Sequence, residues 1–162
     1  MDKTQKEKAM NLIRDFKSGM LVTLGMQDQP HCRPMMIANV DDDLMMTFVT
    51  SLDSVKVDEI RRRGTVGLTL QSPGAFVAME GYAVVVTDDE EKRAAWHPLA
   101  NLWFQSPDDP EAALVKFQPE TIEYWDHRGI NSLRLAFEVV KAAAKGEDPK
   151  AGGPRTHDRL SL

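Results

Sequence analysis

The sequence predicts a mainly β domain (α+β) with short helices inserted, built as a small barrel or a sandwich. Short stretches rich in β-forming residues recur along the chain, and four of the first five are joined by short turns. Short turns connect antiparallel neighbours, whereas parallel strands need long crossovers. With 162 residues, 42% of them hydrophobic, the chain is long enough for one domain with its own core.

The N-terminal half is predicted to begin with a helix and to continue as strands. Thr4 and Glu7 have the spacing of a capping box, and apolar residues at helical spacing follow until just before Gly19. Pro34 indicates an edge strand or a bulge, and Gly81 indicates a bulge or a barrel corner. The predicted elements are strands at 20–26, 31–40 and 44–50, a helix at 55–63, and strands at 65–71 and 75–87.

The C-terminal half is predicted to mix helices and strands. Acidic residues open a helix that ends near Trp96, before Pro98. The elements that follow are a short helix at 99–104, strands at 113–117 and 121–125, and a helix at 131–145. The remaining polar residues indicate a tail that is poorly ordered unless a partner subunit holds it. We therefore assign one domain to residues 1–146 and a C-terminal tail to residues 147–162.

The composition argues against several classes of protein. A formal net charge of -5 disfavours a broad nucleic-acid surface, because phosphate backbones are bound by basic faces. Cys32 is the only cysteine and no histidine has metal-ligand spacing, so we expect neither an intrachain disulfide nor a metal site. The charged N-terminus does not resemble a signal peptide, and no apolar stretch is long enough to span a bilayer. We expect a cytoplasmic protein without a membrane partner.

The junction between the third predicted strand and the helix after it carries a candidate anion site. Its polar side chains are hydroxyls and one cation, at Thr50, Ser51, Ser54 and Lys56. Free N–H groups at a helix N-terminus, hydroxyls and a lysine can together hold a phosphate. The alternative is a simple cap by Asp53 or Ser54 with a solvated lysine, and a carboxylate cap would compete for the same N–H groups.

Two further segments are candidates for a flat ligand. Arg33 and the backbone freed by Pro34 can meet a planar heterocycle with carbonyl oxygens, whose reduced anionic form a cation would stabilise. The alternative is an arginine on the solvent face of an edge strand. In the aromatic segment 96–104, Trp103 and Phe104 can cover such a ring or lie at a subunit interface. Ordinary core packing is the alternative for these aromatic residues.

Several motifs in the same order give the chain a family resemblance. It resembles the pyridoxamine-phosphate-oxidase-like FMN-binding split-barrel proteins, and within them the bacterial general stress protein branch. The resemblance extends from about Met10 to Lys145. It rests on H-x-R-P-M at 31–35, F-V-T-S-x-D-S-x-K at 48–56, paired arginines with V-G-L at 62–68, W-x-P-L-A-x-x-W-F at 96–104 and E-Y-W-D at 123–126.

The resemblance implies a six-stranded antiparallel split β-barrel with flanking helices, and a homodimer with two flavin sites at the subunit interface. It implies ring contacts from Arg33, Pro34 and Met35, and contacts along the ribityl chain from Phe48, Val49 and Thr50. It implies phosphate contacts from Ser51, Ser54 and Lys56. The other subunit would contribute Gln71, Trp103 and Trp125.

The resemblance also implies a function. We expect a flavin-dependent oxidoreductase that uses FMN and passes electrons between a reductant and a small-molecule acceptor. FAD or a deazaflavin in the same site, and a stress protein that binds or senses flavin without catalysis, are the alternatives. No side chain stands out as a general acid or base, so we name no catalytic residue. The pyridoxamine-phosphate oxidases proper have a further C-terminal strand with arginine and histidine contacts to substrate. Residues 155–159 echo it only faintly, so we do not expect oxidation of vitamin B6.

Overall fold

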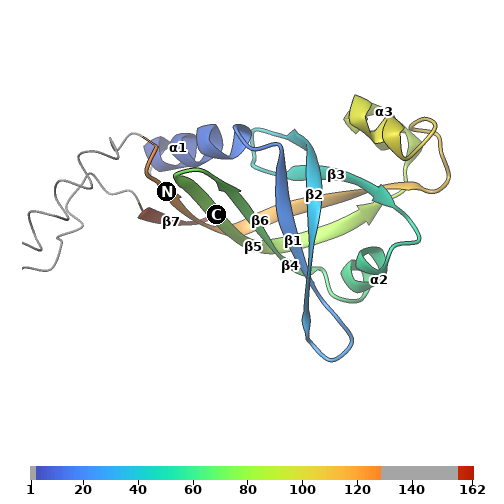
Figure 1. Cartoon of the computed structure of the whole chain (residues 1–162), viewed down its shortest axis with the longest axis horizontal. Helices are drawn as coiled ribbons and strands as arrows, with labels where there is room; N and C mark the ends of the chain where they lie inside the picture. Colours follow the sequence, from blue (N-terminus) through green and yellow to red (C-terminus); the bar gives the residue numbers. More distant parts are fainter. Residues whose placement is uncertain (1–2, 129–156) are drawn as a thin grey trace, which may run out of the picture.

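A computed structural model describes residues 3–128 and 157–162, and the helix expected at 131–145 lies outside the described residues. Figure 1 shows strands curled into a barrel with helices around it. The first half contains α1 (Lys3–Arg14), β1 (Ser18–Leu24), β2 (Pro30–Val40), β3 (Met46–Ser51), α2 (Val55–Arg62) and β4 (Thr65–Ser72). The second half contains β5 (Ala75–Val86), α3 (Asp89–Ala95), the 3-10 helix η1 (Pro98–Leu102), β6 (Ala112–Asp126) and β7 (His157–Ser161).

The strands form one antiparallel sheet that closes on itself. Neighbouring strands follow the order β3-β2-β1-β4-β5-β6, and pairing of β3 with β6 completes the ring. Buried residues alternate with more exposed ones along β4, where Val66, Leu68 and Leu70 face the interior. Within the described residues, this is a closed six-stranded antiparallel barrel flanked by helices, which confirms the fold class predicted from the sequence.

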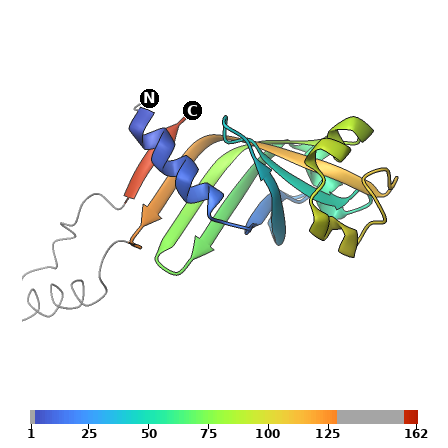
Figure 2. The same ribbon diagram turned by 90° about the horizontal axis from the view of Figure 1, so that it is seen from above.

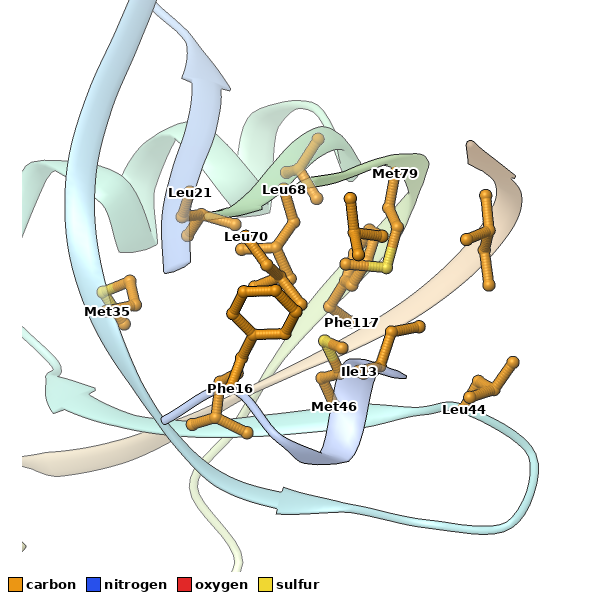
Figure 3. Close-up of a cluster of buried hydrophobic side chains, with 14 of the residues drawn as sticks. Ile13, Phe16, Leu21, Met35, Leu44, Met46, Leu68, Leu70, Met79 and Phe117 are labelled. Atoms are coloured by element: carbon orange, nitrogen blue, oxygen red, sulfur yellow. The ribbon is translucent and has the colours of Figure 1, made fainter. Parts of the chain in front are cut away.

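The interior of the barrel is filled by large apolar side chains from both the strands and α1. Figure 3 shows Ile13 of α1 and Phe16, just after α1, reaching the side chains of Met46 and Phe117. The side chain of Ile13 is fully buried, as are those of Met46 and Phe117. Burial of this apolar surface is the main favourable contribution to folding. The amphipathic pattern predicted for the first helix therefore serves to cover one side of the barrel.

Strand β6 is longer than the sequence predicted. The strands expected at 113–117 and 121–125 are one continuous strand that pairs with β5 from Leu114 to Asp126. Pro119 lies opposite Gly81, where the register of the two strands shifts, so the predicted bulge at Gly81 is confirmed. A side chain at Gly81 would overlap the backbone of residues 118–119. The proline is tolerated because the irregularity already interrupts the regular ladder at this point.

Strand β2 has two neighbours, but the segment that contains Pro34 has only one, which confirms the predicted edge at Pro34; no bulge lies there. Pro34 pairs with Met20 of β1, and the register shift lies between Ile37 and Asn39 instead. The ladder with β3 begins only at Ile37, so residues 30–36 pair with β1 alone. Pro34 therefore occupies a part of β2 where a missing N–H disrupts no second ladder.

Residues 157–161, which we expected to belong to a tail, form strand β7. This strand pairs with the second half of β6, along the edge whose first half pairs with β3. Figure 2 shows β7 beside β6 and close to α1, and Gln5 of α1 donates a hydrogen bond of 2.7 Å to Asp158. Leu160 is buried. Among the described residues, no helix is long and apolar enough to cross a membrane.

Candidate functional site

The connection between β3 and α2 leaves the N-terminus of α2 without a side-chain cap. Ser54 occupies the N-cap position, but its hydroxyl donates to the carbonyl oxygen of Ser51 at 2.8 Å instead of accepting from the helix. Asp53 is exposed and precedes the cap position. The simple cap by Asp53 or Ser54 is therefore not what the structure shows. The N–H of Val57 donates to the carbonyl oxygen of Ser54, but among the described residues no side chain takes up the N–H groups of Val55 and Lys56, which remain available to an anion.

Lys56 lies in the first turn of α2 and is partly buried. Its Nζ donates a hydrogen bond of 2.8 Å to Oγ1 of Thr50, at the end of β3. Burial and the positive charge of nearby Arg33 lower the pKa of Lys56 from its ordinary value. Within the described part of the chain, no carboxylate lies within ion-pair distance of Lys56. A bound anion would supply the missing negative charge.

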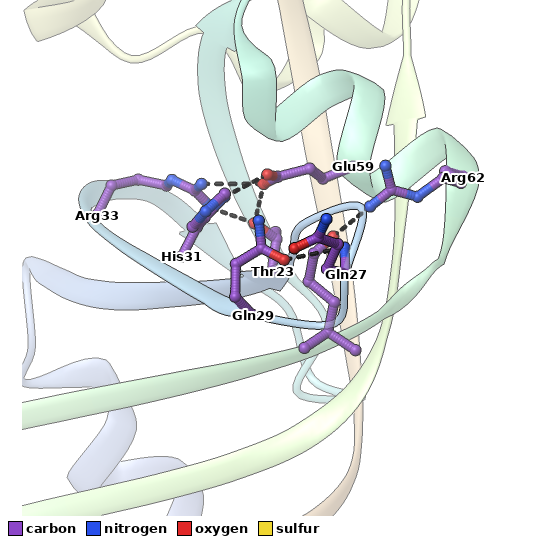
Figure 4. Close-up of polar contacts among 8 residues, drawn as sticks. Thr23, Gln27, Gln29, His31, Arg33, Glu59 and Arg62 are labelled. Carbon is purple, nitrogen blue, oxygen red and sulfur yellow. Dashed lines mark hydrogen bonds and ion pairs between the residues drawn. The ribbon is translucent and has the colours of Figure 1, made fainter.

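Arg33 belongs to a polar cluster formed with Thr23, His31 and Glu59. Figure 4 shows these side chains pointing toward one another from two strands and α2. Arg33 donates to Glu59 at 3.0 Å and also to the hydroxyl of Thr23, while His31 contacts the other carboxylate oxygen of Glu59. The side chain of Arg33 is only 19% exposed, so the alternative of an arginine on the solvent face is wrong.

Glu59 is the acceptor at the centre of this cluster. Its residue is 3% exposed, and it accepts hydrogen bonds from Thr23 and Arg33. Burial by itself would raise the pKa of Glu59, but the hydrogen bonds from Thr23, His31 and Arg33 hold it below its ordinary value. The carboxylate is therefore the stable form inside the fold, and its charge balances that of Arg33. Lys56 is then the nearby cation whose charge no carboxylate of the described residues balances.

The part of β2 that pairs only with β1 lies next to this junction. Arg33 and Pro34 belong to it, and Val49 and Thr50 belong to the neighbouring end of β3. Its backbone groups on the side of β3 take no part in a ladder with that strand. They can donate to and accept from the edge of a planar ring. Cationic groups and a free strand edge are thus brought together from two distant segments.

One predicted ring contact and one predicted ribityl contact have side chains that point into the core of the barrel. Met35 and Phe48 are buried in the core, with exposures of 6% and 0%. A ligand outside the barrel would therefore meet their backbone and not their side chains. Val49 and Ser51, at the end of β3, are partly exposed and can contact it directly.

The three residues expected from a partner subunit lie elsewhere on the chain. Gln71 on β4 and Trp125 on β6 both pair with Phe76 of β5. Gln71, Phe76 and Trp125 therefore lie in one row across the sheet. Trp103 follows η1 and is 66% exposed. Gln71 lies near the C-terminal end of β4, whereas α2 precedes the N-terminal end of that strand. The single chain does not show these residues gathered around Lys56.

The structure adds an apolar pocket that the sequence indicated only through its aromatic segment. Its cavity volume is about 30 Å³, and it opens to solvent between η1 and strands β2 and β3. Two predicted site residues, Val49 and Trp103, line it; the others are Met36, Ile37, Ala38, His97, Leu99, Ala100 and Phe104. Trp96 packs edge-on against Phe104 with ring centroids 6.2 Å apart, so part of the segment serves as packing.

Comparison with known proteins places this architecture in a family. A family model described as pyridoxamine 5'-phosphate oxidase like matches residues 4–150. General stress protein 26 of Bacillus subtilis is 28% identical over 122 residues, covering 72% of this chain and 85% of its own length. The crystal structure of General Stress Protein 26 from Bacillus anthracis is 29% identical with a TM-score of 0.66, over 74% of this chain and 92% of that chain. A pyridoxamine 5'-phosphate oxidase-related, FMN binding protein from Nostoc punctiforme shares the fold at 15% identity and a TM-score of 0.62, over 79% of this chain and 86% of that chain. The chain therefore belongs to the pyridoxamine 5'-phosphate oxidase like family.

Proposed function

We propose that this protein binds FMN and works as a flavin-dependent oxidoreductase. The observation that carries the proposal is the partly buried Lys56, which has a hydroxyl partner and no carboxylate partner among the described residues. It lies beside an uncapped helix N-terminus and near Arg33. These are the features of a site that holds a phosphate.

The phosphate would lie where β3 meets α2. Lys56 would provide the charge, and the hydroxyls of Thr50 and Ser51 and the first N–H groups of α2 would provide hydrogen bonds. Arg33, whose charge is balanced by its ion pair with Glu59, would be held in place to meet the flavin ring. Because the chain as a whole carries a net charge of -5, the local charge of Lys56 and the N-terminus of α2 have to attract the anion.

The flavin ring would lie along the free edge of β2, over Pro34 and beside Val49. The unpaired backbone groups of this edge match the donors and acceptors on the rim of the ring. When bound, the flavin supplies the electron-transfer chemistry, and the residues of this chain bind it, orient it and set the charge around it. FAD differs from FMN only beyond the phosphate, and a deazaflavin differs in the ring, so the same site could hold each of them and the extracted cofactor decides among them.

We further propose a homodimer that completes each flavin site. The outer face of β5 exposes Phe76, Tyr82 and Val84, with exposures of 41%, 53% and 57%. Exposed apolar side chains of this size favour burial against another protein surface. Gln71 and Trp125 flank Phe76, so the same face would carry them to the flavin site of the partner subunit. The cytoplasmic location stays a prediction.

The absorbance spectrum of the purified protein tests the cofactor. We expect the yellow spectrum of an oxidised flavin, or its appearance after FMN is added, and mass spectrometry of the extract should give FMN. A protein that is colourless and does not bind added FMN contradicts the proposal. Recovery of FAD or a deazaflavin instead would replace the cofactor but keep the anion site.

Turnover and assembly are tested separately. An oxidoreductase should speed the oxidation of a reduced nicotinamide by an electron acceptor beyond the rate with the same free FMN. No acceleration with flavin fully bound would favour a binding or sensing protein. Light scattering should give a dimer, and Tyr82→Glu should weaken both the dimer and FMN binding. A monomer with undiminished FMN affinity would refute the shared site.

A further inference from the structure

We propose that Glu59 is a positioning residue for the flavin: it holds the guanidinium of Arg33 in one orientation and balances its charge, and so sets the reduction potential of the bound ring. The inference rests on the proposed flavin function, because it assigns Glu59 a role at that same site. Glu59 would act through Arg33, because its own side chain is only 4% exposed.

Two contacts fix the guanidinium of Arg33. Its Nη1 donates to the hydroxyl of Thr23 on β1, and its Nη2 donates to Oε2 of Glu59 on α2 at 3.0 Å. Figure 4 shows these side chains converging. Because an arginine has five N–H donors, the two contacts leave others for an acceptor on a ligand. The orientation of Arg33 is therefore set before a ligand binds, which lowers the ordering cost of binding.

The carboxylate of Glu59 is itself held from two sides. Its Oε2 also accepts from the fully buried Thr23, and its Oε1 contacts Nδ1 of His31. Rotation of the carboxylate would break these contacts together. Burial alone would raise the pKa of Glu59, but the hydrogen bonds from Thr23, His31 and Arg33 hold it below its ordinary value. The negative charge is therefore fixed in place behind Arg33 at neutral pH.

The two charges of the pair lie at different depths. The side chain of Arg33 is 19% exposed, whereas that of Glu59 is 4% exposed. A ligand outside the barrel would therefore meet the cation first and the carboxylate behind it. Because the two charges lie at unequal distances from such a ligand, they offset each other only in part.

The balance of this pair matters because reduction changes the charge of the flavin ring. Uptake of two electrons and one proton converts the neutral ring into an anion, which a nearby cation stabilises. Arg33 alone would raise the reduction potential of the bound flavin, and Glu59 would limit that rise. The phosphate carries the same charge in both redox states, so its contacts with Lys56 cancel when the two states are compared.

The midpoint potential of the FMN-loaded protein tests this role. Slow reduction beside a reference dye measures it, and circular dichroism checks the fold of each variant. Glu59→Gln keeps the shape of the side chain but removes its charge. The potential should rise by about 30 mV or more, which corresponds to a tenfold gain in affinity for reduced over oxidised FMN. No shift in a folded Glu59→Gln variant would overturn the inference.

Asp58→Asn is the matched control for Glu59→Gln. It removes the same charge from the preceding residue of α2, but Asp58 is exposed and its charge is screened by solvent. It should move the potential less than half as far. Equal shifts in the two variants would show that any carboxylate on α2 has this effect, and the specific role of Glu59 would be wrong.

Arg33→Ala gives a second test, which holds even if Glu59→Gln does not fold. Loss of the cation should lower the potential, in the direction opposite to Glu59→Gln. Adding Glu59→Gln to Arg33→Ala should then change the potential less than half as much as in the wild type. Glu59 would have no guanidinium to hold, and without its ion-pair partner the buried carboxylate binds a proton more readily. An unchanged potential in Arg33→Ala, or a full effect of Glu59→Gln without Arg33, would overturn the inference.

FMN titration of the same samples separates this inference from the proposed function. If Glu59→Gln binds oxidised and reduced FMN more weakly by the same factor, its potential does not move and the role of Glu59 is only structural. That result refutes the inference and leaves the flavin site intact. If the wild-type protein does not bind FMN at all, the proposed function fails, and the role of Glu59 fails with it.

Discussion

Lys56 donates a hydrogen bond of 2.8 Å to the hydroxyl of Thr50, and this contact joins the first turn of α2 to the end of β3. The lysine is thereby held at a junction where a strand end, an uncapped helix and a second cation meet. Burial and the charge of Arg33 lower its pKa, and a bound anion would favour the charged ammonium. This arrangement makes Lys56 the most direct test of the site.

Lys56→Ala should weaken FMN binding while the fold persists. Loss of a hydrogen bond to a charged group costs about 1.5–3 kcal/mol, which corresponds to roughly tenfold or more in affinity. Titration of flavin-free protein with FMN, followed by flavin fluorescence, measures the change. Arg61→Ala is the matched control, because Arg61 is exposed in the last turn of the same helix. Equal affinities for both variants would contradict a phosphate at Lys56.

Arg33→Ala should affect both binding and stability. FMN affinity should fall roughly tenfold or more, because a charged donor is removed. The melting temperature should fall too, because the buried carboxylate of Glu59 loses its ion-pair partner. Arg33→Lys keeps the charge but not the planar fork, so it should recover part of the affinity and less of the stability. A variant with unchanged FMN binding would remove Arg33 from the site.

Glu59→Gln should destabilise the protein in a pH-dependent manner. The folded-state pKa of Glu59 is below its ordinary value of 4.5, so the carboxylate stabilises the fold above that value. We expect a loss of about 2–4 kcal/mol in the free energy of unfolding near neutral pH. As the pH falls through the lowered pKa, the wild-type protein loses this contribution and the difference between the two proteins shrinks.

Urea unfolding of both proteins across this pH range measures the effect. Glu90→Gln serves as the control, because Glu90 is exposed on α3. Its difference from the wild type should be small at every pH. The difference in the free energy of unfolding between the wild type and Glu59→Gln should shrink below the ordinary carboxyl pKa. A difference that stays constant there would show that the carboxylate is not the stabilising form.

Gly81→Ala should destabilise the barrel where β5 bends along β6. A Cβ at this position would lie 2.8 Å from Cα of Pro119 and still closer to the carbonyl oxygen of Gln118, so backbone has to move. Overpacking of this kind costs about 1–3 kcal/mol. Gly67→Ala is the control, because its Cβ would meet Val22 at an ordinary 3.5 Å. Denaturant unfolding of both variants should show a clearly larger loss for Gly81→Ala.

The sequence by itself determined the elements whose signals are local. Short strands with short turns predicted an antiparallel barrel or sandwich, the family resemblance selected the barrel, and the residues before Gly64 predicted α2. Gly81 marked the register shift in β5, because glycine is needed where another backbone comes close. The hydroxyls and the lysine of 50–56 marked the junction that we propose as the anion site, and motif order indicated the family.

Only the tertiary structure decided the features that depend on distant partners. Strand β7 exists because the second half of β6 offers a free edge, which no local pattern in 157–161 reveals. Arg33 lies inside a cluster because α2 brings Glu59 to it, and the apolar pocket exists because η1 lies against β2 and β3. Local propensity is encoded within a few neighbouring residues, whereas burial, ion pairing and strand partners depend on which surfaces the folded chain brings into contact.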